Sequence, residues 1–147
     1  MNKDYLIFLK EIKERINLAQ YTALKTVNKE LINLYWDIGK KIVDKQKQQG
    51  WGNSIVKNLA NDLQKEYPGI SGFSAPNLWR MKNFYLNYEK DIKLAPLVRE
   101  ISWSKNIIIL EKCKKDLEKE FYLKQTKENN WTKNLLIHHI ENQTLYV

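Results

Sequence analysis

The stretch Tyr67-Pro68-Gly69-Ile70-Ser71-Gly72-Phe73-Ser74-Ala75-Pro76 separates two helical patterns and decides how they are joined. Pro68 cannot continue the helix before it, and the two glycines supply the backbone freedom that a tight turn needs. Ser74 is a favourable N-cap, and Pro76 falls in the first helical turn, where a missing N–H costs nothing. We therefore expect two helices joined by a short turn, as in a helix-turn-helix unit.

The helices on either side of this turn form the predicted core of the unit, over about residues 51–88. The first begins at Asn53 or Ser54, either of which can cap it, and closes at Tyr67. The second runs from about Ala75 to Tyr88. At 100° per residue, one side of this second helix carries a polar stripe and the other side carries large apolar residues. The polar stripe consists of Asn77, Arg80, Asn83 and Asn87.

The composition favours a single globular domain with a basic surface. The 147 residues carry 25 Lys and Arg against 17 Asp and Glu, a net charge of +8 that is spread over the whole length. Such a charge favours nucleic acid as a partner, although many basic proteins bind no polyanion. No segment is apolar enough to span a bilayer, no signal peptide opens the chain, and there is one cysteine. We expect a cytoplasmic protein without disulfides.

The first 50 residues predict an unusually long amphipathic segment. Apolar residues recur in steps of three and four from Leu6 to Ile42, which indicates one helix, or two helices that meet near Leu18–Thr22. A single helix of that length would project from a compact domain or pair with another subunit. Gly39 is expected to allow close packing against a second helix.

The rest of the chain predicts further helices. Residues 89–101 contain Pro96 and lack a helical period, so they form either an irregular connection or a small β-ribbon, the wing of a winged helix. Ser104 and Thr132, each after a tryptophan, are expected to cap two helices, and a third covers residues 116–128. The predicted fold is mainly α, with five or six helices, and resembles a helix-turn-helix or winged-helix domain with a long N-terminal helix.

The polar stripe of the second core helix supplies the candidate binding residues. Asparagine and arginine pair with the edges of adenine and guanine, and a helix of this kind fits the major groove of DNA. The alternative is a solvated polar face with no ligand. We expect base contacts from Asn77, Arg80 and Asn83, and phosphate contacts from Ser74, Lys82 and Lys57.

No pattern in the sequence predicts catalysis, a metal or a cofactor. There is no glycine-rich phosphate loop, and Cys113 has no recognisable catalytic partner. His138 and His139 are adjacent, so they point to different sides of a helix and cannot hold one metal ion from one face. We therefore expect no enzyme activity from this chain alone.

Several segments together resemble the N-terminal domain of bacterial YhcG-type proteins. The resemblance covers roughly residues 17–146. The segments that carry it are Leu34-Tyr35-Trp36-Asp37-Ile38-Gly39, Gly50-Trp51-Gly52, Tyr67-Pro68-Gly69, Gly72-Phe73-Ser74, Asn77-Leu78-Trp79, Ser102-Trp103-Ser104, Glu120-Phe121-Tyr122 and Asn130-Trp131-Thr132.

The resemblance implies a winged-helix-like domain that commonly precedes a nuclease domain of the PD-(D/E)XK type. It therefore implies a DNA-binding role, or a role within a larger assembly, for the single domain of residues 1–147. The expected partners are duplex DNA, a nuclease supplied in trans and, from the long N-terminal helix, a second copy of the chain. Lys105 stands where family members often carry histidine, so no role of that imidazole is carried over. No position matches the nuclease carboxylates, and the expected chain is a free-standing targeting domain, a split-gene partner or a truncated product. The alternative function is a protein-interaction or oligomerisation module that uses the long N-terminal helix.

Overall fold

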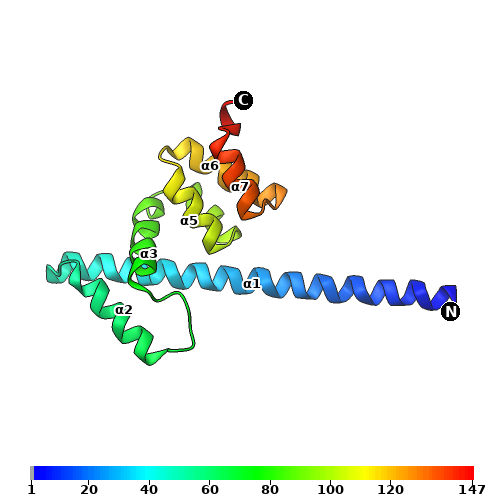
Figure 1. Cartoon of the computed structure of the whole chain (residues 1–147), viewed down its shortest axis with the longest axis horizontal. Coiled ribbons are helices and arrows are strands. Elements are labelled where there is room, and N and C mark those ends of the chain that lie inside the picture. Colours follow the sequence, from blue (N-terminus) through cyan, green and yellow to red (C-terminus); the bar gives the residue numbers. More distant parts are fainter. Residues whose placement is uncertain (1) are drawn as a thin grey trace.

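A computed structural model describes residues 2–147, and all of its regular structure in that range is helical (Figure 1). Seven α-helices and two short 3-10 helices follow one another along the chain. They are α1 (Lys3–Gln49), α2 (Ser54–Glu66), α3 (Ala75–Tyr88), α4 (Leu94–Leu97), η1 (Val98–Glu100), α5 (Trp103–Lys112), α6 (Asp116–Asn129), α7 (Lys133–Glu141) and η2 (Thr144–Tyr146).

Helix α1 is continuous, which settles the choice between one helix and two. Its first turn is capped by Asn2, whose side chain accepts a hydrogen bond from the N–H of Asp4, and it ends at Gly50 in the left-handed conformation. Its 47 residues correspond to about 70 Å of helix. Figure 1 shows that the other helices gather around the C-terminal part of α1, while its N-terminal part projects alone.

The core forms where α3 crosses α1. Gly39 lies directly against the backbone of Met81, as expected, and a methyl group there would meet the Met81 carbonyl. One cluster of buried side chains joins α1, α2 and α3 around Val56, Leu78 and Met81. A second joins α3 to the C-terminal helices around Phe84 and other buried residues: Ile32, Tyr88, Leu94, Val98, Ile101, Ile109, Cys113, Tyr122, Leu123 and Leu136.

The turn between α2 and α3 has the predicted form. Ser74 caps α3, accepting a hydrogen bond from the N–H of Asn77, and Gly72 has a positive φ of 105°. The predicted cap of α2 is only partly right. Asn53 precedes the helix, but its side chain makes no capping hydrogen bond.

The predicted wing is not seen, because no strand occurs between residues 2 and 147. The segment 89–101 forms α4 and η1 instead. Its first turn is organised by Asp91, whose carboxylate accepts hydrogen bonds from the N–H groups of Lys93 and Leu94. Pro96 lies early enough in α4 that its missing N–H removes no helical hydrogen bond. The fold is an all-helical domain with a long N-terminal helix, and residues 2–147 lack the strands of a winged helix.

The C-terminal helices begin close to where the sequence predicted. Thr132 caps α7, as expected, by accepting a hydrogen bond from the N–H of Leu135. Helix α5 begins earlier than predicted, because Ser102 and not Ser104 takes the extended cap conformation and accepts from the N–H of Lys105. Trp103 is therefore the first residue of α5, and its ring packs between Tyr35 and Phe84.

Candidate functional site

The residues predicted to start the recognition helix are engaged within the protein. Asn77 donates to the carbonyl oxygen of Gly72 and accepts from the indole N–H of Trp103 at 2.9 Å. Both ends of its amide are therefore in use. The hydroxyl of Ser74 serves as the cap of α3. These two side chains hold the turn and the start of α3 in place.

Arg80 and Asn83 lie together in a polar pocket of about 300 Å³ between α3, α5 and α6. The Arg80 guanidinium pairs with the Glu111 carboxylate at 3.0 Å, and both side chains are about half exposed. We call this site the polar pocket. Its lining residues are Arg80, Asn83, Asn87, Leu110, Glu111, Cys113, Lys114 and Lys119.

Three charged residues of the polar pocket, Glu111, Lys114 and Lys119, were not among the predicted binding residues, and Lys119 is the most buried of them. Its side chain is buried, with 6% of its surface exposed, and its ammonium donates to Asn87 Oδ1 at 3.0 Å. None of the ion pairs among residues 2–147 involves it. A buried ammonium without a carboxylate partner is costly and favours an anion beside it. The signal was available, because Lys119 shares the buried face of α6 with Tyr122 and Thr126.

The two remaining predicted residues, Lys57 and Lys82, do not line the polar pocket. Lys57 is exposed on α2. The ammonium of Lys82 lies 4.9 Å from the centre of the Trp79 ring. The structure thus brings together two of the six predicted residues, uses two inside the fold and leaves two elsewhere.

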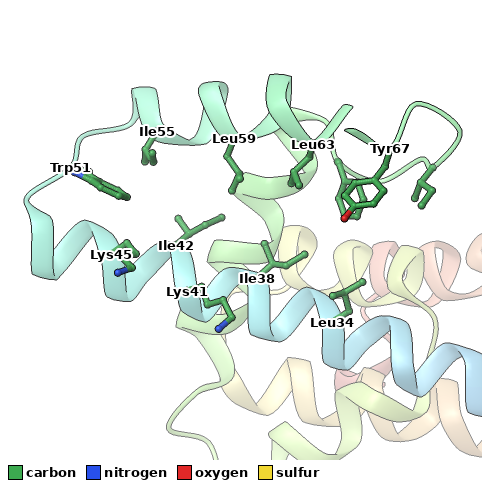
Figure 2. A pocket seen from close by; sticks show the side chains of 12 residues that line it. Leu34, Ile38, Lys41, Ile42, Lys45, Trp51, Ile55, Leu59, Leu63 and Tyr67 are labelled. Atoms are coloured by element: carbon green, nitrogen blue, oxygen red, sulfur yellow. The ribbon is translucent and has the colours of Figure 1, made fainter. Parts of the chain in front are cut away.

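A second candidate site is an apolar groove of about 540 Å³ between α1 and α2 (Figure 2). Figure 2 shows Ile55, Leu59 and Leu63 of α2 pointing toward α1, whose side chains point back toward α2 across the gap. Lys41 and Lys45 are the charged residues in its lining. We call this site the α1–α2 groove. The other residues that line it are Leu34, Ile38, Ile42, Trp51, Tyr67, Ile70 and Phe73.

The N-terminal part of α1 exposes many large apolar side chains. Among the most exposed are Leu24 at 70%, Val27 at 64% and Tyr21 at 61%. Large exposed apolar surfaces are unusual on soluble monomers, so this part of α1 is a candidate interaction surface. No helix among residues 2–147 is long and apolar enough to cross a membrane.

The described residues offer no metal site, and their one cysteine is not an activated nucleophile. Residues 2–147 contain no group of three or more His, Cys, Asp and Glu side chains that could hold a metal ion. His139 stacks on the Trp131 ring with a centroid distance of 4.0 Å. Burial raises the pKa of the Cys113 thiol to about 11, so it stays protonated at neutral pH and is a poor nucleophile.

The sequence of residues 11–146 matches the family described as DUF1016 N-terminal domain. The chain belongs to this family. The resemblance to YhcG-type proteins is thereby confirmed. The DUF1016 N-terminal domain takes up nearly all of the 147 residues, so no nuclease domain lies within them. No curated protein and no solved structure matches the chain.

Proposed function

We propose that this DUF1016 N-terminal domain is a non-catalytic DNA-binding module that holds backbone phosphates at the polar pocket. The observation that supports this most is the convergence of Arg80, Lys114 and the buried Lys119 on one pocket that contains a single carboxylate, that of Glu111. The resemblance to domains that precede PD-(D/E)XK nucleases adds a biological reason, and the proposed role is to target such a nuclease to DNA.

A phosphate suits this pocket for chemical reasons. Its oxygens are strong acceptors, and a guanidinium binds them in a fixed two-point geometry. The amides of Asn83 and Asn87 offer further hydrogen-bond donors, and Asn87 Nδ2 now donates to the backbone oxygen of Asn83. Phosphate contacts position a protein on DNA without reading its sequence. The proposed binding is therefore weakly specific, and α3 contributes more to anchoring than to reading bases.

A salt titration of duplex binding by fluorescence anisotropy tests this proposal. Three cations on phosphates predict a slope of about −3 in a plot of log affinity against log salt concentration. Arg80→Ala and Lys114→Ala should each weaken binding to every sequence and make the slope shallower by about 1. Lys133→Ala, which removes an exposed charge from α7, is the matched control. The proposal fails if both pocket variants bind as tightly as the control.

A second candidate function is an assembly module, and the exposed apolar side of α1 specifically favours it. In this function α1 and the α1–α2 groove bind another protein, either a second copy or a nuclease partner. Removing residues 1–16 takes away part of the exposed surface but touches neither the polar pocket nor the helices that form it. That deletion should abolish assembly and leave DNA affinity unchanged, with mass measured by light scattering.

A further inference from the structure

One face of α1 carries apolar residues from its projecting end into the α1–α2 groove. Apolar residues follow each other in steps of three and four along α1, so they share one face of the helix. The three of them nearest the C-terminal end of α1, Leu34, Ile38 and Ile42, also line the α1–α2 groove. We call this face the apolar stripe. It consists of Tyr5, Leu9, Ile12, Ile16, Ala19, Ala23, Val27, Leu31, Leu34, Ile38 and Ile42.

The projecting part of the apolar stripe cannot be buried within one chain, although Ile42 at its other end is already buried. Residues 3–31 contain neither glycine nor proline, and α1 is continuous through them. A helix without such residues does not fold back sharply. Leu9 therefore stays about 44 Å along the helix axis from Ile38, which follows it by 29 steps of about 1.5 Å each. Whatever covers the projecting part of the stripe must come from another molecule.

We propose that a second copy of this chain covers it, with the two α1 helices antiparallel. The proposal rests on the assembly function above and names its partner. The stripe is self-complementary in this direction. Each of its residues meets a stripe residue of the second copy, and in every such pair the two residue numbers add up to 46 or 47. Leu9 then faces Ile38 of the second copy, so the projecting end of each α1 enters the groove of the other. The remaining pairs are Tyr5–Ile42, Ile12–Leu34, Ile16–Leu31 and Ala19–Val27, and Ala23 meets Ala23 of the second copy at the centre.

Charges beside the stripe support the antiparallel direction. Four charged residues beside the stripe are all exposed, and none takes part in an ion pair among residues 2–147. They are Asp4, Arg15, Glu30 and Lys41. In the proposed register Asp4 lies beside Lys41 of the second copy, and Arg15 lies beside its Glu30. A parallel pair would instead place each of these charges against itself, and like charges across a helix pair are destabilising.

The surface is large enough for a stable dimer. Six large residues of the stripe are exposed in each chain. At about 80 Å² for each of these part-exposed side chains, the twelve of a dimer cover roughly 1,000 Å² before their neighbours are counted. A specific interface buries at least about this much in total. The six are Tyr5, Ile12, Ile16, Val27, Leu31 and Leu34.

Cysteine cross-linking of the full chain tests both the partner and the register. In a Cys113→Ala background, the Leu9→Cys/Ile38→Cys double variant should give a covalent dimer on mild oxidation. The single variants Leu9→Cys and Ile38→Cys should stay uncross-linked, since each thiol would lack a partner. Ile16→Cys/Leu31→Cys provides a second pair of positions if the first double variant folds poorly, as judged by circular dichroism.

A charge exchange gives an independent readout. Asp4→Lys alone should weaken the dimer about fivefold or more, because the altered pair occurs twice in each dimer. Adding Lys41→Asp should restore it, as measured by sedimentation. Cross-linking of Leu9→Cys alone would overturn the register in favour of a parallel pair, and a monomeric mass at about 100 µM would overturn the dimer. These outcomes do not decide the proposed DNA function, because the salt titration of duplex binding tests residues of the polar pocket and not of α1.

Discussion

Replacing Gly39 by alanine should destabilise the protein, even though alanine is the better helix former. The new Cβ would lie 2.7 Å from the carbonyl carbon of Met81, closer still to its oxygen, and 3.2 Å from the backbone nitrogen of Lys82. Ordinary contacts at a Cβ begin near 3.4 Å. Because the atoms it meets belong to backbone, α1 and α3 must move apart by about 1 Å to accept it.

The expected cost follows from two opposing effects. Overpacking a core costs about 1–3 kcal/mol, with a backbone clash at the upper end. Alanine returns up to about 1 kcal/mol through its higher helix propensity. The net loss is about 1–2 kcal/mol, which lowers the melting temperature by about 3–8 °C in a domain of this size.

Urea unfolding and thermal scans of Gly39→Ala measure this loss. Gly52→Ala is the matched control, because a methyl group added at Gly52 would have no heavy atom within 4 Å and the φ of Gly52 is not positive. It should change the free energy of unfolding by less than about 0.5 kcal/mol. A Gly39→Ala protein as stable as wild type would show that helix propensity outweighs the contact, and would refute the close packing of α1 on α3.

Three further predictions concern the C-terminal half. Asn106→Leu should lower the free energy of unfolding by about 1–3 kcal/mol in urea, because the buried amide donates to the carbonyls of Val98, Ile101 and Ser102. Trp103→Phe removes the hydrogen bond to Asn77 and should cost about 1 kcal/mol in the same assay. Burial raises the pKa of the Cys113 thiol from 9.0 to about 11, so folding favours the protonated form and stability should fall between those pH values. A Cys113→Ala protein should lose less stability than wild type over this pH range, as measured by urea unfolding at both ends of it.

Local chemistry explains what the sequence predicted well. A helix cap depends on one side chain and the backbone three residues away, so Ser74 and Thr132 were identifiable from the sequence alone. The limits of α3, Ala75 and Tyr88, were predicted for the same reason. Gly39 was also interpretable, since glycine inside an apolar helical face commonly marks a close approach.

What the sequence did not predict depends on distant partners. Asn77 faces Trp103, 26 residues away, and that contact decides whether its amide is free to bind a base. Lys119 is buried because α3 supplies Asn87 as its acceptor, 32 residues earlier. Residues 89–101 do not form the β-ribbon of a wing, one of the two predicted alternatives, for a similar reason. Asn106 of α5 takes up the Val98 carbonyl, so residues 89–101 are held as short helical turns against α5.

The DNA-binding proposal and the dimer proposal together predict a dimer with two DNA-binding bodies that lie far apart. Each body consists of the helices that gather around α3 in one chain. In the antiparallel register Gly39 lies level with Phe8 of the second copy along the helix axis, so the two Gly39 positions lie about 46 Å apart along the paired helices. Each α3 packs on its own Gly39, and a separation of about 46 Å corresponds to about 14 base pairs of DNA. Two bodies on one duplex bind with a gain in avidity only if the duplex spans both. Affinity should therefore rise steeply between duplexes of about 10 and 20 base pairs. A gradual rise with length, seen equally when residues 1–16 are removed, would mean that the bodies bind DNA independently.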